Sequence, residues 1–156
     1  MEKTEMVKSA IRQAIKDANL KFDTSPDGNI FILNFSIDSQ ISSVRLFINA
    51  TNLGFTIVSI PPFQGDVNNR NVMYELAALA TRINYKIRLF KFSMDFSDGE
   101  LRCELDLPVE GDAQLSPVTV TEYIMLTLKM WESYGACFLG VLFGGKTAED
   151  AFNDAK

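Results

Sequence analysis

The stretch "KIRLFKFSMDFSDGELRCELDL", residues 86–107, decides the fold because it predicts two antiparallel strands joined by a hairpin. In both halves, apolar and polar side chains alternate with the period of a strand that buries one face. The positions expected to face the core are Phe90, Phe92, Met94 and Phe96 before the tip, and Leu101, Cys103, Leu105 and Leu107 after it. On the return strand, the positions expected to face water are Arg102, Glu104 and Asp106. The tip, Ser97-Asp98-Gly99, supplies residues that tolerate positive φ and so predicts the hairpin turn.

Around this hairpin, periodicity predicts three helices and three further strands. Apolar residues recur every three or four positions in residues 2–19, 68–84 and about 120–144. Strand patterns occupy residues 30–37, 43–50 and 54–60, the last ending at two prolines. We therefore predict an α+β fold of order α-β-β-β-α-β-β-α, in one domain spanning residues 1–156. One antiparallel sheet of about five strands would carry helices mainly on one face.

The composition excludes several classes of function. Hydrophobic residues make up 47% and charged residues 22%, as in ordinary globular domains, and the net charge of −5 argues against a nucleic-acid partner. No apolar run is long enough to span a bilayer and the first residues do not resemble a signal peptide, so we expect a cytoplasmic protein with no membrane insertion. The chain has no histidine, which removes triad hydrolases and most zinc sites. We predict a protein that is not an enzyme, with no cofactor and no metal, and with its two cysteines as free core thiols.

The stretch "GVLFGGKT", residues 140–147, satisfies the phosphate-loop pattern, so a nucleotide-binding protein is an alternative to be weighed. A phosphate loop lies between a strand and a full helix, whereas here a helix comes first and only nine residues follow. The same letters predict a helix end at Gly144 and Gly145, then a short terminal helix capped by Thr147, with Asp150 at the third position. We favour the capping interpretation.

The stretch "DTSPDGNIFILN", residues 23–34, matches the first half of an EF-hand calcium loop. Its twelfth position is Asn34 where a bidentate glutamate is required, and a strand pattern replaces the second helix. Turn chemistry around Asp27-Gly28 explains the residues better.

The second face of the predicted sheet carries apolar side chains where full exposure to water would favour polar ones. They are Ile30, Ile32, Phe47, Val58 and Ile60. Such a face is a candidate protein-interaction surface, unless one of the helices covers it, and the sequence leaves that alternative open. Phe63, in the loop after Pro61 and Pro62, is a further candidate contact, although strand termination explains that loop better.

Four stretches follow one another in the order of these elements: "IFILNFSI", "SIPPF", "LAALATRINYKIRLFKFSMDFSDGELRCELDLP" and "LGVLFGGKTAEDAF". With these stretches, the chain resembles the YbjN-like family, described as sensory-transduction regulators with the fold of type III secretion chaperones. The resemblance implies a homodimer that binds protein segments on apolar surfaces and supplies no catalytic residues. We therefore expect a non-enzymatic interaction module, chaperone-like or regulatory, with an unknown protein client. A small-ligand sensor with a pocket near Trp131 is a second alternative.

Overall fold

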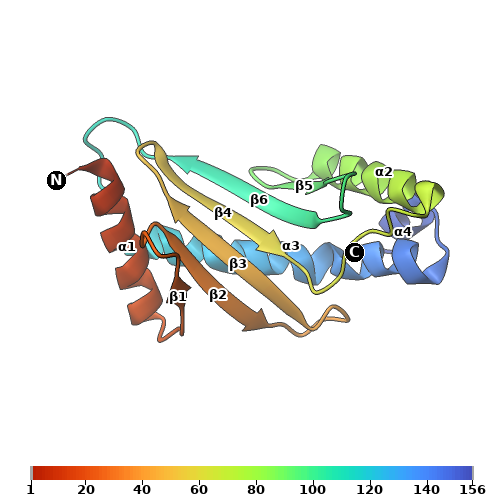
Figure 1. Ribbon diagram of the computed structural model, residues 1–156, viewed down its shortest axis with the longest axis horizontal. Helices are drawn as coiled ribbons and strands as arrows, with labels where there is room; N and C mark the ends of the chain where they lie inside the picture. Colours follow the sequence, from red (N-terminus) through yellow and green to blue (C-terminus); the bar gives the residue numbers. More distant parts are fainter. Residues whose placement is uncertain (1, 156) are drawn as a thin grey trace.

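The computed structural model describes residues 2–155 and has an α+β architecture (Figure 1). Within these residues, four helices and six strands follow one another. They are α1 (Lys3–Asp17), β1 (Asp23–Thr24), β2 (Ile30–Ser36), β3 (Ser43–Ala50), β4 (Gly54–Ile60), α2 (Arg70–Lys86), β5 (Lys91–Met94), β6 (Leu101–Pro108), α3 (Pro117–Gly144) and α4 (Ala148–Asn153).

The strands form one antiparallel sheet of order β1-β2-β3-β4-β6-β5. The sheet has six strands rather than about five because the turn-rich segment before β2 folds back on it as the two-residue strand β1. The N–H of Ser25 donates to the carbonyl of Ile30 at 2.9 Å, and the carboxylate of Asp27 accepts from the Ser25 hydroxyl at 2.6 Å and from the Asn29 N–H at 3.0 Å. These bonds hold the pKa of Asp27 below its usual value. The turn interpretation of this stretch therefore has a structural basis.

The core lies on one face of the sheet, between the strands and helices α1 and α3. In Figure 1, α3 passes behind the strands, α1 lies at one end, and α2 lies beside β5. The core side chains of the central strands are fully buried, as their alternation predicts: Phe31, Leu33, Leu46, Ile48, Ile57, Cys103 and Leu105.

A buried hydrogen-bond relay ties α3 to this sheet. The indole Nε1 of Trp131 donates to the hydroxyl of Ser59 at 2.7 Å, and that hydroxyl donates to the carbonyl of Cys103 at 2.8 Å. Trp131 and Ser59 are both completely buried, and the ring of Phe92 meets Trp131 edge-on with 5.1 Å between centroids. The relay fixes the position of α3 across β4 and β6 because each donor and acceptor in it has no access to water.

The hairpin of residues 86–107 forms, but its first strand ends earlier than the sequence predicts. Strand β5 stops at Met94, and Phe96 is 54% exposed instead of buried. A turn replaces the strand there, since the N–H of Asp95 donates to Glu100 and the N–H of Gly99 donates to Asp95. Gly99 has a φ of 82°, the conformation expected for the tip. Phe96 packs against Tyr74 of α2 instead, with 6.0 Å between ring centroids.

The outer edge of β5 is closed by a side chain of α2. Asn84 accepts from the Phe92 N–H at 2.8 Å and donates to the Phe92 carbonyl at 2.9 Å. The amide thus forms both hydrogen bonds that a neighbouring strand would form with this residue. Such a cap removes the unpaired backbone groups that make an edge strand a template for aggregation.

Candidate functional site

The side of the sheet opposite the core is the candidate site, because no helix within residues 2–155 packs on it (Figure 1). The alternation of β2, β3 and β4 turns the second set of side chains toward this side, which we call the open face. It consists of Ile30, Ile32, Phe47, Val58 and Ile60, each half-buried by its neighbours, together with the polar side chains between them.

Strand register brings the central residues of the open face together. Ile32 pairs with Phe47, Phe47 pairs with Val58, and Val58 pairs with Glu104 of β6. Neighbouring strands lie about 4.8 Å apart, so the three apolar side chains form a continuous row roughly 10 Å wide. An apolar row of this kind, left uncovered by its own chain, is typical of a surface that binds another protein.

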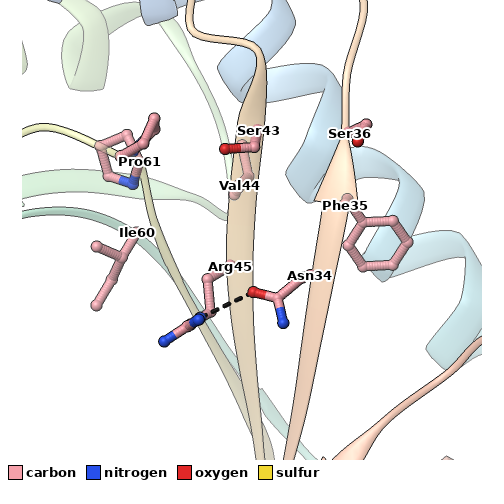
Figure 2. Close-up of a pocket in the computed structure, with 9 residues that line it drawn as sticks. Asn34, Phe35, Ser36, Ser43, Val44, Arg45, Ile60 and Pro61 are labelled. Carbon is pink, nitrogen blue, oxygen red and sulfur yellow. Dashed lines mark hydrogen bonds between the residues drawn. The ribbon is translucent and has the colours of Figure 1, made fainter.

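Ile60 lies at one end of the open face beside a shallow pocket (Figure 2). Residues of β2 and β3, together with Ile60 at the end of β4 and the two prolines that follow it, line this pocket, which has a volume of about 410 Å³. In Figure 2 the side chains of Asn34 and Arg45 lie side by side on adjacent strands, and the Arg45 Nε donates to the Asn34 oxygen at 2.8 Å. This hydrogen bond orients the guanidinium along the rim of the apolar row.

Charged side chains at the other rim of the open face are paired with one another. Arg102 donates to Glu100 at 2.5 Å and its other nitrogen lies 3.8 Å from Glu104. The hydrogen bond to Glu100 raises the pKa of Arg102, which stays charged. The hydroxyl of Ser93 donates to Glu104 at 3.1 Å. The rim is therefore polar and largely neutralised, as is common around an apolar binding patch.

Phe63 stands apart from the row. It lies in the loop that follows β4, partly buried against the hydrophobic core, and lines a small hollow with Ile60, Pro61, Pro62 and Glu100. Of the six side chains proposed as contacts, the structure brings five together on the open face and places Phe63 beyond its end.

The C-terminal stretch has the geometry of a helix end followed by a capped helix. Gly140 to Gly144 form the last turn of α3, and Gly145 ends it in the left-handed conformation with φ 65°. The Thr147 hydroxyl accepts from the Asp150 N–H at 3.2 Å, while Glu75 of α2 accepts from the Ala148 N–H at 2.6 Å. Lys146 is hydrogen-bonded to Asp154, which raises the pKa of the lysine.

This arrangement does not form a phosphate cradle. A cradle needs a loop whose backbone N–H groups converge on the phosphates, whereas the glycine-rich residues here are helical up to Gly144. No group of three or more potential metal-ligating side chains occurs in residues 2–155. Trp131 is fully buried in the core, where its indole is hydrogen-bonded to Ser59.

The sequence reasoning missed a second apolar surface, on the outer side of α3. Its exposed side chains are Val118, Met125, Leu126 and Phe143. The sequence does contain a pattern for this surface, because the apolar residues 118, 125 and 143 fall on one stripe at helical spacing. The stripe is hard to recognise because α3 is apolar on nearly every side. No helix in residues 2–155 is long and apolar enough to cross a membrane.

A family model matches most of the chain, over residues 8–139. That family, YbjN, is described as "Putative bacterial sensory transduction regulator". The match covers most of α1, the whole sheet, α2 and most of α3, so it includes all the residues of the open face. No curated protein is similar enough in sequence to count as a match.

Proposed function

Because this chain belongs to the YbjN family, we propose that it acts as a regulator by binding a protein segment across the open face, as a homodimer and without catalysis. The observation that carries the proposal is the uncovered row Ile32, Phe47 and Val58. A row that spans three strands is roughly 10 Å wide, close to the 10–12 Å diameter of a helix with its side chains. The segment it suits best is an amphipathic helix with one apolar stripe.

The closed β5 edge of the sheet supports binding on the face rather than at that edge. Strand β5 has its Phe92 backbone groups bonded to Asn84 and is covered by α2. Adding a partner strand there would first require breaking two hydrogen bonds. The open face requires no such rearrangement, because no helix within residues 2–155 packs on it.

The test is site-specific photo-crosslinking in the native host, with the photoreactive residue replacing Phe47 in one variant and Val58 in another. We expect both variants to capture the same partner, at contact points that mass spectrometry maps to one apolar stripe. A variant carrying the reactive residue at Tyr85, which is 87% exposed on α2, is the matched control. Adding Phe47→Asp to the Val58 variant should abolish the adduct, since a carboxylate at the centre of the row opposes apolar burial.

Two results would contradict the proposal. The first is a set of adducts at Phe47 and Val58 that is the same as the set obtained at Tyr85. The second is an adduct at Val58 that survives Phe47→Asp in a variant whose far-ultraviolet circular dichroism shows it to be folded.

A further inference from the structure

The outer side of α3 carries an unusual share of the exposed apolar surface. Of the ten large hydrophobic side chains that are exposed in residues 2–155, four lie on this helix. Phe143 is 76% exposed, Val118 65%, Met125 45% and Leu126 39%. A surface helix normally presents polar residues on its outer side, as α1 does with Arg12, Gln13 and Lys16.

Two hollows border this stripe, one at each end of the helix. The N-terminal hollow, of about 560 Å³, lies between the end of α1 and the large side chains Val118, Met125 and Leu126. The C-terminal hollow, of about 930 Å³, lies along the small residues Ala136, Gly140 and Gly144 and extends to α4. Lys129 borders both hollows. Phe143 also lines the C-terminal hollow, so a large exposed side chain stands beside the small residues there.

We propose that the outer side of α3 is the interface through which two copies of this chain pair, with the two α3 helices antiparallel about a two-fold axis at the helix midpoint. This inference rests on the homodimer named in the proposed function. In this arrangement, residues equally far from the two ends of α3 lie opposite each other. Val118 then faces Phe143 of the second copy, Met125 faces its Ala136, and Lys129 faces its Glu132.

Shape supports the antiparallel arrangement. Met125 of one α3 packs over the small residue Ala136 of the other, and Phe143 enters the N-terminal hollow of the second copy. Each contact occurs twice, as a two-fold interface requires. Over its 28 residues, α3 is about 42 Å long, so the paired helices form an extended contact.

Charge selects the register. Lys129 and Glu132 lie next to the helix midpoint, are exposed, and form no ion pair within the described part of the chain. When the two helices overlap along their full length, Lys129 of each copy lies opposite Glu132 of the other, which gives two ion pairs across the axis. The interface leaves the open face unobstructed, because α3 covers the opposite side of the sheet.

The experiment measures the dimer dissociation constant by sedimentation equilibrium for the wild-type chain and for variants at exposed positions. We expect a wild-type mass of twice the 17.5 kDa chain. Phe143→Ala should weaken the dimer about 100-fold, because it removes a large anchor twice per dimer. Tyr85→Ala, at an equally exposed aromatic residue on α2, should leave the constant unchanged.

Charge reversal tests the register. Lys129→Glu should weaken the dimer about tenfold by placing like charges opposite each other, and adding Glu132→Lys should restore most of the affinity. Restoration by Glu122→Lys instead would indicate a shorter overlap and overturn the register. A dimer that is insensitive to both Phe143→Ala and Lys129→Glu overturns the α3 interface but leaves the homodimer standing. A wild-type monomer at every concentration overturns both, while the photo-crosslinking result stands independently.

Discussion

The relay Trp131–Ser59–Cys103 predicts a specific cost for Ser59→Ala. The change removes one oxygen, but that oxygen is both the acceptor for the Trp131 indole N–H and the donor to the Cys103 carbonyl. Within the described residues, every buried side-chain nitrogen and oxygen has a hydrogen-bond partner, so the variant would create a single unsatisfied indole N–H. Stranding a buried polar group costs about 1–3 kcal/mol, and we expect about 2 kcal/mol.

The assay is urea denaturation followed by far-ultraviolet circular dichroism. With a slope of about 2 kcal/mol per molar urea, the expected loss lowers the unfolding midpoint by about 1 M. A double-mutant cycle with Trp131→Phe isolates the cause, since phenylalanine has no N–H to strand. In that background, Ser59→Ala should cost about 1 kcal/mol less, and this difference is the coupling energy of the pair.

Two results would refute the reasoning. One is a cost of Ser59→Ala below about 0.5 kcal/mol in the wild-type background, which would mean that the indole finds another partner. The other is an equal cost in both backgrounds, which would mean that the hydroxyl acts through the Cys103 carbonyl or through packing and not through Trp131.

Two other parts of the structure give further predictions. Asn84→Ala should lower the unfolding free energy by about 2 kcal/mol and increase light scattering on storage, because it exposes the Phe92 backbone at the sheet edge. The control is Asn52→Ala, at an exposed asparagine. Equal stability and equal scattering of the two variants would contradict the capping role of Asn84. Cys103 should resist thiol reagents at pH 8 in the native protein and react on unfolding, since burial, with a smaller effect of Glu104, raises the pKa of its thiol. Because the folded pKa lies above the unfolded value of 9.0, stability should fall as pH rises past 9, and rapid native labelling of Cys103 would contradict this account.

Regular alternation made most of the sheet predictable from the sequence. In the longer strands, apolar residues that face the core recur at every second position. Phe31, Leu46 and Leu105 belong to such runs, and all three are buried as predicted. Strand β1 has only two residues, so it has no period to detect and depends on the turn that returns the chain to β2. In the sequence, Phe96 continues the apolar alternation of β5. In the structure, the backbone hydrogen bonds of the Asp95–Glu100 turn end the strand before Phe96.

The candidate site could be predicted only in part. Strand alternation determines which side chains share a face of the sheet, whereas tertiary packing determines whether that face is exposed. Alternation placed Phe47 and Val58 on the second face of the sheet. Whether a helix covers that face depends on where α1, α2 and α3 pack, and no local pattern encodes that choice. Phe143 illustrates the same difficulty, since a helix that is apolar on nearly all sides does not reveal which of them meets water.

The position of Ser59 gives the molecule a built-in optical probe. Ser59 lies between Val58 and Ile60 on β4, so the residue that bonds the indole is flanked by two residues of the open face. Trp131 is the only tryptophan in the chain, and its fluorescence therefore arises from this one junction between sheet and helix. A segment that docks on Val58 and Ile60 would press on the strand that holds the indole, and the emission wavelength would register its arrival without any attached dye.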